Sequence, residues 1–526
     1  MSFSLPENMP ELSLGIPSER SSIGGVELNA DLLRHWIKEL PNNNFDEYIQ
    51  LYRDALQRFN LNKLDVQQRL ALLDLYREPL NNILFKLSLE QLSKRVPTLA
   101  KRHIVINGLA ELMAELAIGY KIAVIDAGEN NNKLKINPVA LLAINRAGEQ
   151  LNYMVLHAYK FHQEVPALIF HELHQLYQLT MSANVENKTP VVNQNLQSES
   201  SFKQLYSQLM LISISNPYGL RDNEVLKAYQ VMEQLADVTE ITPLPPSAKA
   251  TAGHFYINCL RDHIPTPSVL PVLDNQAQPP ALILNTKPVL VIVDSLFEQP
   301  KKEQDLAAET QMDLLRLLIP FLNTSYERKQ PRTAVTGNKQ AYIATGLTAV
   351  HHCLNEFRTQ PDEITNKLSS PWKILNKNGS GYLLCRQSIV EQQEITIGDF
   401  VGIFEFGATG KPLARIAFIR WMKTDASGKT KIGLSIIEGD PVSVHYSITA
   451  DQHFQPALLL PEIDRIKQAA SLITASDVFA VERNLTIRPK KKRFQFSMTI
   501  SDLLNSGNNY EHFALSELAE KTLSIE

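Results

Sequence analysis

The chain has 526 residues, more than a single hydrophobic core can organise, so its length alone predicts several domains. Lys and Arg number 52 against 56 Asp and Glu, and the formal net charge of −4 excludes a general electrostatic attraction to nucleic acid or to an anionic membrane. The first residues lack the basic start and long apolar run of a signal peptide, and no apolar stretch approaches the roughly 20 residues that a membrane helix needs. We therefore expect a cytoplasmic protein with no membrane span and no nucleic-acid partner.

The N-terminal half is predicted to be helical after a short tail. Residues 1–25 are rich in Pro, Ser, Glu and Gly, which is typical of a loose tail. Within residues 26–240 leucines recur at helical steps, as at Leu70 and Leu73, and Asp65 stands just before them as an N-cap. This pattern predicts a helical domain of stacked antiparallel hairpins.

Three further features refine the helical domain. Pro79 lies inside the leucine-rich helix and is expected to kink it or to divide it in two. Two more helices are predicted at about residues 165–181 and 201–215, where apolar residues again follow the helical period.

A proline-rich segment near residue 240 marks a change from helices to strands. Residues 241–325 are predicted to hold a linker, short strands at His254–Asn258 and Val289–Val293, and a connecting helix at about residues 303–322. Short strands separated by regular turns then predict an antiparallel β-barrel over residues 326–450. Further strands predict a small C-terminal β extension, residues 451–526, and the expected fold class is multidomain α + β.

Two short polar segments could form a binding site in the predicted barrel. Arg328 and Arg332 are four residues apart, so in an extended segment both side chains point the same way and can hold one ligand. Their guanidinium groups have the planar geometry that binds phosphate. About forty residues later, Asn376 and Asn378 can read the edges of guanine, and Gly381 allows a close approach of backbone to ligand. Together the segments predict a site for a doubly phosphorylated purine; apart, they would be a surface turn and two solvated arginines.

The order of these segments resembles the PilZ domain family over residues 326–447. That family has R-x-x-x-R, then [D/N]-x-S-x-x-G, then a barrel with a Gly-Asp turn and a late Trp strand. Gly398–Asp399 and Arg420–Trp421 of this chain match the later features. The sequence departs from the second motif at Asn378, where the family has serine.

The resemblance implies a PilZ-like barrel that binds the bacterial second messenger cyclic di-GMP through Arg328, Arg332, Asn376, Asn378 and Gly381. It also implies a receptor rather than an enzyme, with no cofactor beyond this ligand and with outputs such as motility, adhesion or biofilm control. The helical region is expected to bind an unidentified protein partner. The alternative is a ligand-independent adaptor with a degenerate barrel.

A group of histidines raises a second alternative, a metal-dependent hydrolase. His157, His162, His171 and His174 lie within eighteen residues, and Phe170–His174 contains H-E-x-H. The zinc-protease motif is H-E-x-x-H, which puts the two imidazoles and the glutamate in a different register. The apolar residues of the same segment fit ordinary helix packing. We therefore expect no metal here, and consider the hydrolase the weaker alternative.

The cysteines and one basic segment suggest no further chemistry. Cys259, Cys353 and Cys385 are too widely spaced for a zinc motif or a disulfide framework, and are expected to be packed thiols. The run Arg488–Arg493 is expected to be a solvated turn or a strand edge protected by charge.

Overall fold

The structure is a computed structural model of the 526-residue chain. It describes residues 12–517 and 523–524, except for gaps at 18–19, 22–23, 42–43, 97, 129–135, 191–199, 246–250, 268–279, 299–305, 324–332, 358, 369–370, 387–394, 407–410, 449–452, 464–467, 490–493 and 508. The chain divides into two compact units, Met1–Glu327 and Arg328–Glu526.

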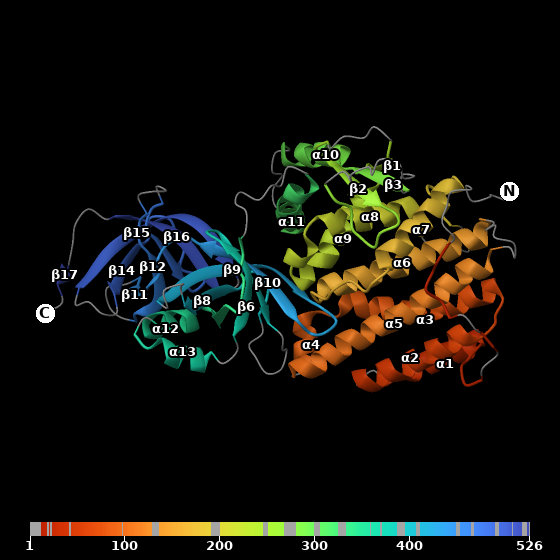
Figure 1. Ribbon diagram of the computed structural model, residues 1–526, viewed down its shortest axis with the longest axis horizontal. Helices are drawn as coiled ribbons and strands as arrows, with labels where there is room; N and C mark the ends of the chain where they lie inside the picture. The colour runs from red at the N-terminus through yellow and green to blue at the C-terminus, as the bar shows by residue number, and fades with distance from the viewer. Residues whose placement is uncertain are drawn as a thin grey trace. The chain divides into compact units, whose positions relative to one another are not determined.

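The first unit is built mainly of helices (Figure 1). Their bounds are α1 Ala30–Glu39, α2 Phe45–Leu61, α3 Val66–Lys86, α4 Leu89–Arg95, α5 Leu99–Asp126, α6 Pro138–Lys160, α7 Ile169–Ser182, α8 Phe202–Ile214, α9 Asp222–Ala236, α10 Lys287–Glu298 and α11 Leu306–Leu322. None of the described helices combines the length and the apolar character that crossing a bilayer requires.

Side-chain caps explain where several of these helices begin. Asp65 accepts hydrogen bonds from the backbone N–H groups at the start of α3, which confirms the predicted N-cap. Ser88 and Ser201 form capping boxes at α4 and α8. The helix α3 continues through Pro79, so it is not divided there.

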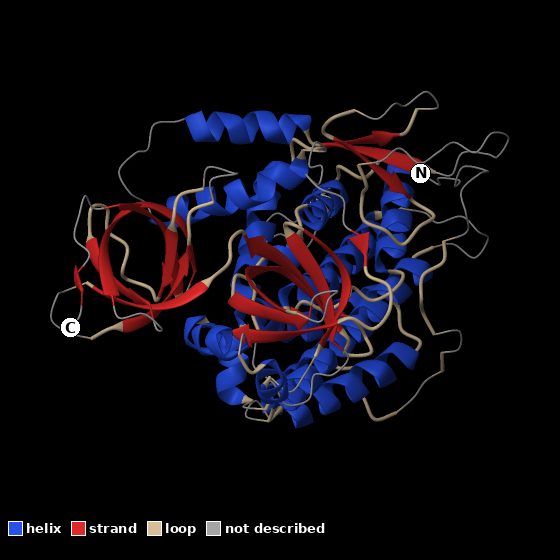
Figure 2. Cartoon of the chain, turned by 60° about the vertical axis from the view of Figure 1, so that its left-hand side comes forward, coloured by secondary structure: helices blue, strands red, loops and turns tan. Residues whose placement is uncertain are grey.

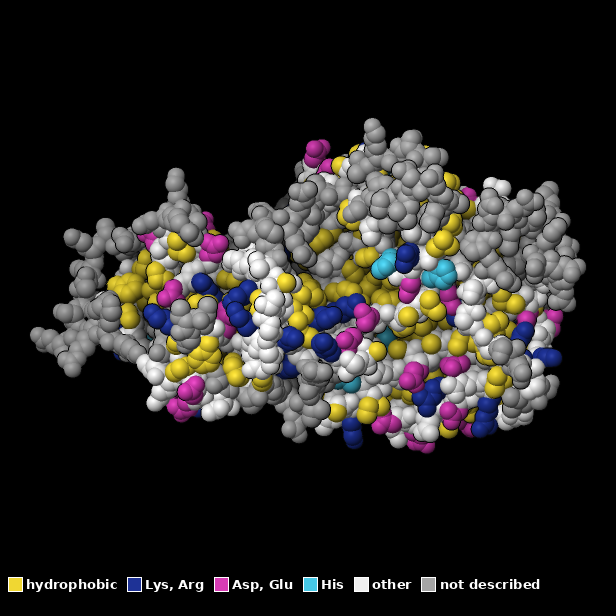
Figure 3. All heavy atoms as spheres, in the orientation of Figure 1, with side chains coloured by type: hydrophobic (Ala, Val, Ile, Leu, Met, Phe, Trp, Pro, Cys, Tyr) yellow, Lys and Arg dark blue, Asp and Glu magenta, His cyan; other side chains and the backbone are white. Residues whose placement is uncertain are grey.

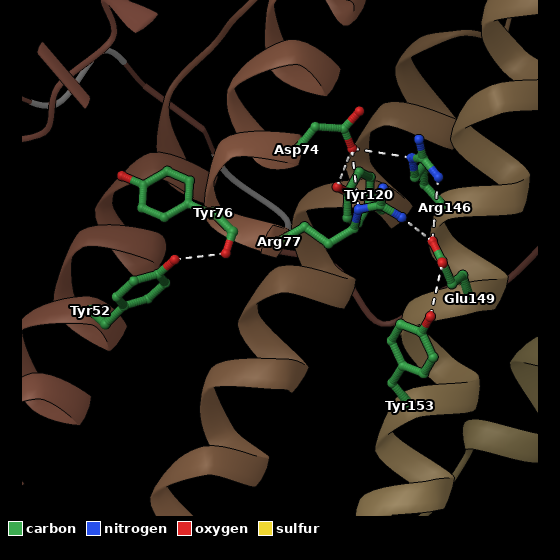
Figure 4. A network of polar contacts seen from close by, with 8 residues as sticks. All are labelled: Tyr52, Asp74, Tyr76, Arg77, Tyr120, Arg146, Glu149 and Tyr153. Atoms are coloured by element: carbon green, nitrogen blue, oxygen red, sulfur yellow. Dashed lines mark hydrogen bonds and ion pairs between the residues drawn. The ribbon is translucent and has the colours of Figure 1, made fainter. Parts of the chain in front are cut away.

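An ionic network joins α3, α5 and α6 inside this unit (Figure 4). Its members are Asp74, Arg77, Tyr120, Arg146, Glu149 and Tyr153. Asp74 Oδ1 accepts from Tyr120 Oη at 2.6 Å and from Arg146 Nε at 3.1 Å, while Glu149 pairs with Arg77. Two carboxylates balance two guanidinium groups, so removal of one partner would leave a poorly solvated charge behind.

The first unit also contains a three-stranded antiparallel sheet, in the order β1 (Glu240–Pro243), β3 (Ala281–Asn285), β2 (His254–Asn258). The strand predicted at His254–Asn258 is therefore confirmed. The strand predicted at Val289–Val293 is wrong, because these residues lie in the helix α10. Val289 and Val293 are both fully buried, and their spacing of four residues suits a helix that packs one face on the core.

The second unit contains two closed antiparallel barrels, whose strands curve around in Figure 2. The strands of the first barrel are β5 Gln340–Thr345, β6 Trp372–Asn378, β7 Gly381–Arg386, β8 Phe400–Phe406, β9 Pro412–Thr424 and β10 Thr430–Ile437, with β4 Thr333–Ala334 added alongside β6. Those of the second are β11 Val442–Ser447, β12 Gln455–Leu460, β13 Ser471–Thr474, β14 Asn484–Pro489, β15 Phe494–Gly507 and β16 Tyr510–Glu517, with β17 Leu523–Ser524 added alongside β15. The predicted organisation, a helical region followed by antiparallel β structure with a barrel, is confirmed, and the predicted β extension is itself a barrel.

The two barrels have the same strand connectivity. If the strands of each barrel are numbered from one to six along the chain, both close in the order 1-2-3-6-5-4. The strand β6 thus corresponds to β12, and β7 corresponds to β13. This shared connectivity allows the same place to be compared in both barrels.

Two short helices, α12 (Leu347–Phe357) and α13 (Pro361–Lys367), follow β5. The helix α12 contacts β8 and β5 of the first barrel and β11 and β12 of the second. Phe357 lies against Phe404 with ring centroids 5.1 Å apart, and His351 Nε2 donates to the carbonyl of Val444 at 3.0 Å. The helix therefore packs between the barrels, in a hydrophobic cluster to which residues of both barrels contribute.

Candidate functional site

The hairpin of β6 and β7 carries the polar segment that the sequence singled out. The strands pair up to Asn378 and Gly381, so the connection is only Gly379 and Ser380. The side-chain oxygen of Asn378 accepts from the backbone N–H and from the hydroxyl of Ser380, both at 3.1 Å. The carbonyl of Ser380 accepts from Ile436 N on β10 at 3.0 Å. Both ends of the turn are therefore fixed.

A bulge in β6 decides which of its side chains face outward. The pairing with β7 shifts between Ile374 and Asn376, so one extra residue interrupts the alternation of faces. Ile374 belongs to the interior core of the barrel, whereas Lys377 reaches the buried Glu405. Asn376 therefore lies with Asn378 on the outer face, since residues two apart in a strand share a face.

The strand β4 connects this hairpin with the predicted arginine segment. Thr333 pairs with Lys377, and Ala334 pairs with Asn376. Arg328 and Arg332 lie outside the described residues, but Arg332 is the neighbour of Thr333 in the chain. The described register thus places Thr333, the residue after Arg332 in the sequence, beside Lys377 on β6.

A half-buried tryptophan lies on the same outer face. Asn376 pairs with Leu383, Leu383 with Gly433, and Gly433 with Trp421, which forms one row across four strands. A Cβ atom on Gly433 would come within 1.9 Å of Trp421 Nε1, so the indole lies directly across this glycine. An indole held over the sheet beside Asn376 offers a surface on which a purine base could stack.

The next row of the outer face is basic. Lys373 pairs with Cys385, Cys385 with Lys431, and Lys431 with Lys423, again across four strands. Burial raises the pKa of the Cys385 thiol, and the lysines beside it act in the opposite direction. Adjacent strands are about 4.8 Å apart, so three lysines in one row create a positive field that favours an anionic ligand. Over the barrels, the face seen in Figure 3 carries a group of Lys and Arg side chains.

Polar side chains also meet inside the barrel below the hairpin. Lys377 Nζ donates to both carboxylate oxygens of Glu405, at 2.8 and 2.9 Å, and Tyr382 Oη donates to Glu405 Oε1 at 2.5 Å. The Glu405 side chain is only 2% exposed. Burial and the carboxylate of Glu405 raise the pKa of the Tyr382 hydroxyl, which therefore stays protonated and donates.

The histidines that suggested a hydrolase are engaged in packing. His174 is fully buried, with Nδ1 2.6 Å from the Tyr206 hydroxyl and Nε2 3.0 Å from the carbonyl of His263. Burial lowers the pKa of His174 to about 4. The glutamate of the H-E-x-H segment, Glu172, is held in a buried ion pair with Lys121 at 3.0 Å. Both ring nitrogens and the carboxylate are therefore occupied.

The other three histidines of this group also have local partners. His157 Nε2 and His162 Nε2 each lie 2.9 Å from a backbone carbonyl oxygen, and both rings are buried. His171 Nε2 lies 2.7 Å from Gln175 Nε2 on the same helix. Among the residues that the structure describes, no group of three or more His, Cys, Asp or Glu side chains is placed to hold a metal ion.

Sequence reasoning selected some residues of this region and overlooked others. It selected Asn376, Asn378 and Gly381, which the structure brings together on one hairpin. It noted Trp421 only as part of a family pattern and did not identify the lysine row. Alternation within β9 and β10 could have indicated that Trp421, Lys423, Lys431 and Gly433 share a face, but only the register shows that they adjoin Asn376.

Comparison with known proteins assigns matches to two parts of the chain. Residues 31–247 match the family model described as the N-terminal domain of the cyclic-di-GMP receptor FimW. Residues 442–518, which span the strands of the second barrel, match the FimW C-terminal β-barrel domain. The first barrel lies between these two ranges.

Individual relatives support the same relationship. The curated cyclic-di-GMP receptor FimW of Pseudomonas aeruginosa (strain PAO1) is 22% identical over an alignment that covers 88% of this chain and 87% of the relative. A solved structure, the Bacillus subtilis inhibitor of motility MotI/DgrA, is 10% identical over 35% of this chain and 90% of that one. Its TM-score is 0.12, which is too low to support a shared fold. The names of the FimW matches describe a receptor and not an enzyme, in agreement with the prediction. This chain is thus similar, in its helical region and in its second barrel, to a family of cyclic-di-GMP receptors with a C-terminal β-barrel.

Proposed function

We propose that this protein is a receptor for cyclic di-GMP and that the ligand binds on the outer face of the first, PilZ-like barrel. The observation that supports this proposal is the pairing of β4 with β6, because Thr333, which follows Arg332 in the sequence, pairs with Lys377 between Asn376 and Asn378. Similarity to FimW, a cyclic-di-GMP receptor by name, supports the choice of ligand. No cofactor other than this ligand is needed.

The proposed site divides the recognition of the ligand among chemically distinct groups. Arg328 and Arg332 would bind the two phosphates with paired N–H donors. Asn376 would hydrogen-bond a guanine edge, and the indole of Trp421 would stack on a base. The absence of a Cβ at Gly381 would leave room for the ligand at the end of the hairpin.

Signalling would follow from binding of the phosphates. We infer that contacts of Arg328 and Arg332 with the two phosphates change the surface that the protein presents to a protein partner. A protein partner of the helical region, a cytoplasmic location and outputs in motility or biofilm control stay predictions.

Calorimetric titration of the full chain with cyclic di-GMP tests the proposal. We expect micromolar or tighter affinity, which corresponds to about −8 kcal/mol or more. GTP and cyclic AMP serve as controls, because they test whether a purine with phosphate is sufficient for binding. If millimolar cyclic di-GMP gives neither heat nor a shift in melting temperature, the receptor function is refuted and the ligand-independent adaptor takes its place.

A further inference from the structure

The interior of the first barrel changes character at the end nearest the β6–β7 hairpin. Most of the interior is apolar, with members such as Ile374, Leu384 and Ile403. At the hairpin end, Lys377, Tyr382 and Glu405 replace apolar side chains. Burying a carboxylate costs free energy unless the group is paired and hydrogen-bonded, so the presence of this polar group in an apolar interior requires an explanation.

The strand that supplies Glu405 lies across the barrel from the hairpin. Around the ring, β8 is separated from β7 by two strands on either side, so the two strands occupy opposite walls. Glu405 therefore reaches across the interior and contacts Lys377 on β6 and Tyr382 on β7. The ammonium group of Lys377 also lies 5.4 Å from the centre of the Tyr382 ring. A single carboxylate thus connects three strands.

The position of Lys377 makes this connection relevant to the outer face. Lys377 lies between Asn376 and Asn378, and these neighbours point outward because Lys377 points inward. The bulge before Asn376 permits this orientation, but a bulge alone leaves the register weakly specified. The ion pair with Glu405 supplies a specific interaction that is available only when Lys377 faces the interior.

We propose that Glu405 is a positioning residue for the nucleotide site: by binding Lys377 and Tyr382 inside the barrel, it fixes the orientation of Asn376 and Asn378 outside. This inference rests on the proposed function, since it assigns a role within the same site. Glu405 itself does not touch the ligand.

The test separates orientation from stability with a double substitution. Changing Lys377 alone would strand a buried carboxylate and could unfold the barrel, so we choose Lys377→Met together with Glu405→Gln, which removes both charges. The matched control is Lys121→Met with Glu172→Gln, which removes a buried Lys–Glu pair of the helical unit. Affinity for cyclic di-GMP and hydrogen exchange at the amides of residues 376–381 are measured for both variants.

We expect the barrel variant to bind about three- to tenfold more weakly, the scale of one lost polar contact, and to exchange its hairpin amides faster without ligand. The control should retain wild-type affinity and hairpin exchange. If the barrel variant does not fold, Tyr382→Phe, which removes only the hydroxyl contact, should show the same two changes to a smaller degree. Unchanged affinity and unchanged exchange in a folded barrel variant would overturn the inference. If the wild-type protein binds no cyclic di-GMP, the proposed function fails, while the exchange rates still decide whether Glu405 orders the hairpin.

Discussion

The two barrels share one connectivity but differ at the place where the first carries its candidate site. In the first barrel, β6 and β7 are joined by two residues, Gly379 and Ser380. In the second, the corresponding strands β12 and β13 are joined by ten residues, 461–470. A two-residue connection brings the ends of both strands, and the polar residues on them, next to each other. The comparison teaches that connectivity alone does not specify a binding site; the hairpin and its side chains do.

Charge distinguishes the same two pairs of strands. The strands β6 and β7 contain Lys373, Lys377 and Arg386, but β12 and β13 contain no basic residue. The apolar side chains of β12 and β13 instead pack in the second barrel's own core and in the cluster around α12. We therefore expect the first barrel to bind the anionic ligand and the second to support it.

The largest effect should come from the arginines before the first barrel. Arg332→Lys keeps the charge but loses the two-point contact with a phosphate, and Arg328→Ala loses charge and contact together. Each change should cost about 1.5–3 kcal/mol of binding free energy, or roughly ten- to a hundredfold in affinity, without unfolding the barrel. Calorimetry measures both.

A matched change in the second barrel serves as the control for the arginines. Arg488 lies 4.1 Å from the centre of the Phe454 ring, so Arg488→Lys also replaces a planar cation by a compact one. Its affinity should equal that of the wild type. If the Arg328 and Arg332 variants also bind like the wild type, the ligand binds elsewhere and the proposed difference between the barrels is wrong.

The stacking surface should have a similar or somewhat smaller effect. Trp421→Ala removes the indole that lies across Gly433, and the loss of one base–aromatic stack costs about 1–3 kcal/mol. Quenching of indole fluorescence by the ligand should disappear in part with this variant. Phe454→Ala, in the second barrel, is the control and should leave affinity unchanged; equal losses in the two variants would contradict a site on the first barrel.

A smaller effect is expected from the lysine row. Lys373→Gln with Lys431→Gln should weaken binding only a few fold, because these side chains are solvated and act mainly through their field. The difference from wild type should shrink as salt is raised from 50 to about 500 mM. Lys367→Gln, on α13, removes a charge outside this row and should change neither affinity nor its salt dependence. A difference that persists at high salt would indicate direct contact with the ligand.

The smallest effect should come from Asn378→Ser, which installs the residue that the PilZ pattern has at this position. The side-chain oxygen of Asn378 caps the turn at Ser380, and a serine hydroxyl can also accept a hydrogen bond there. We expect affinity to stay within about threefold of wild type or to improve. A large loss would show that the amide, rather than the turn geometry, is what this chain requires.

The sequence predicted local features, such as helix caps, better than it predicted which distant residues lie close together in the fold. Asp65 could be assigned as a cap because capping depends on residues two and three positions away. The strand predicted at Val289–Val293 was wrong. A run rich in β-branched residues favours a strand, but here packing of one face on the core stabilises a helix. Asn376 and Asn378 stood out by composition. Trp421 adjoins Asn376 only through the pairing of four strands, and Glu405 reaches Lys377 only across the barrel interior, and no local pattern encodes either relation.

The helix α12 has a consequence for how such a chain can be divided in evolution. Ser443 Oγ donates to the carbonyl of His351 at 2.9 Å, and Leu458 and Leu460 of the second barrel share a core cluster with Val350 and Phe357. A gene fragment that ended after β10 would leave one side of this helix exposed to water. We therefore expect evolution to retain the two barrels together, even though only one of them carries the candidate site.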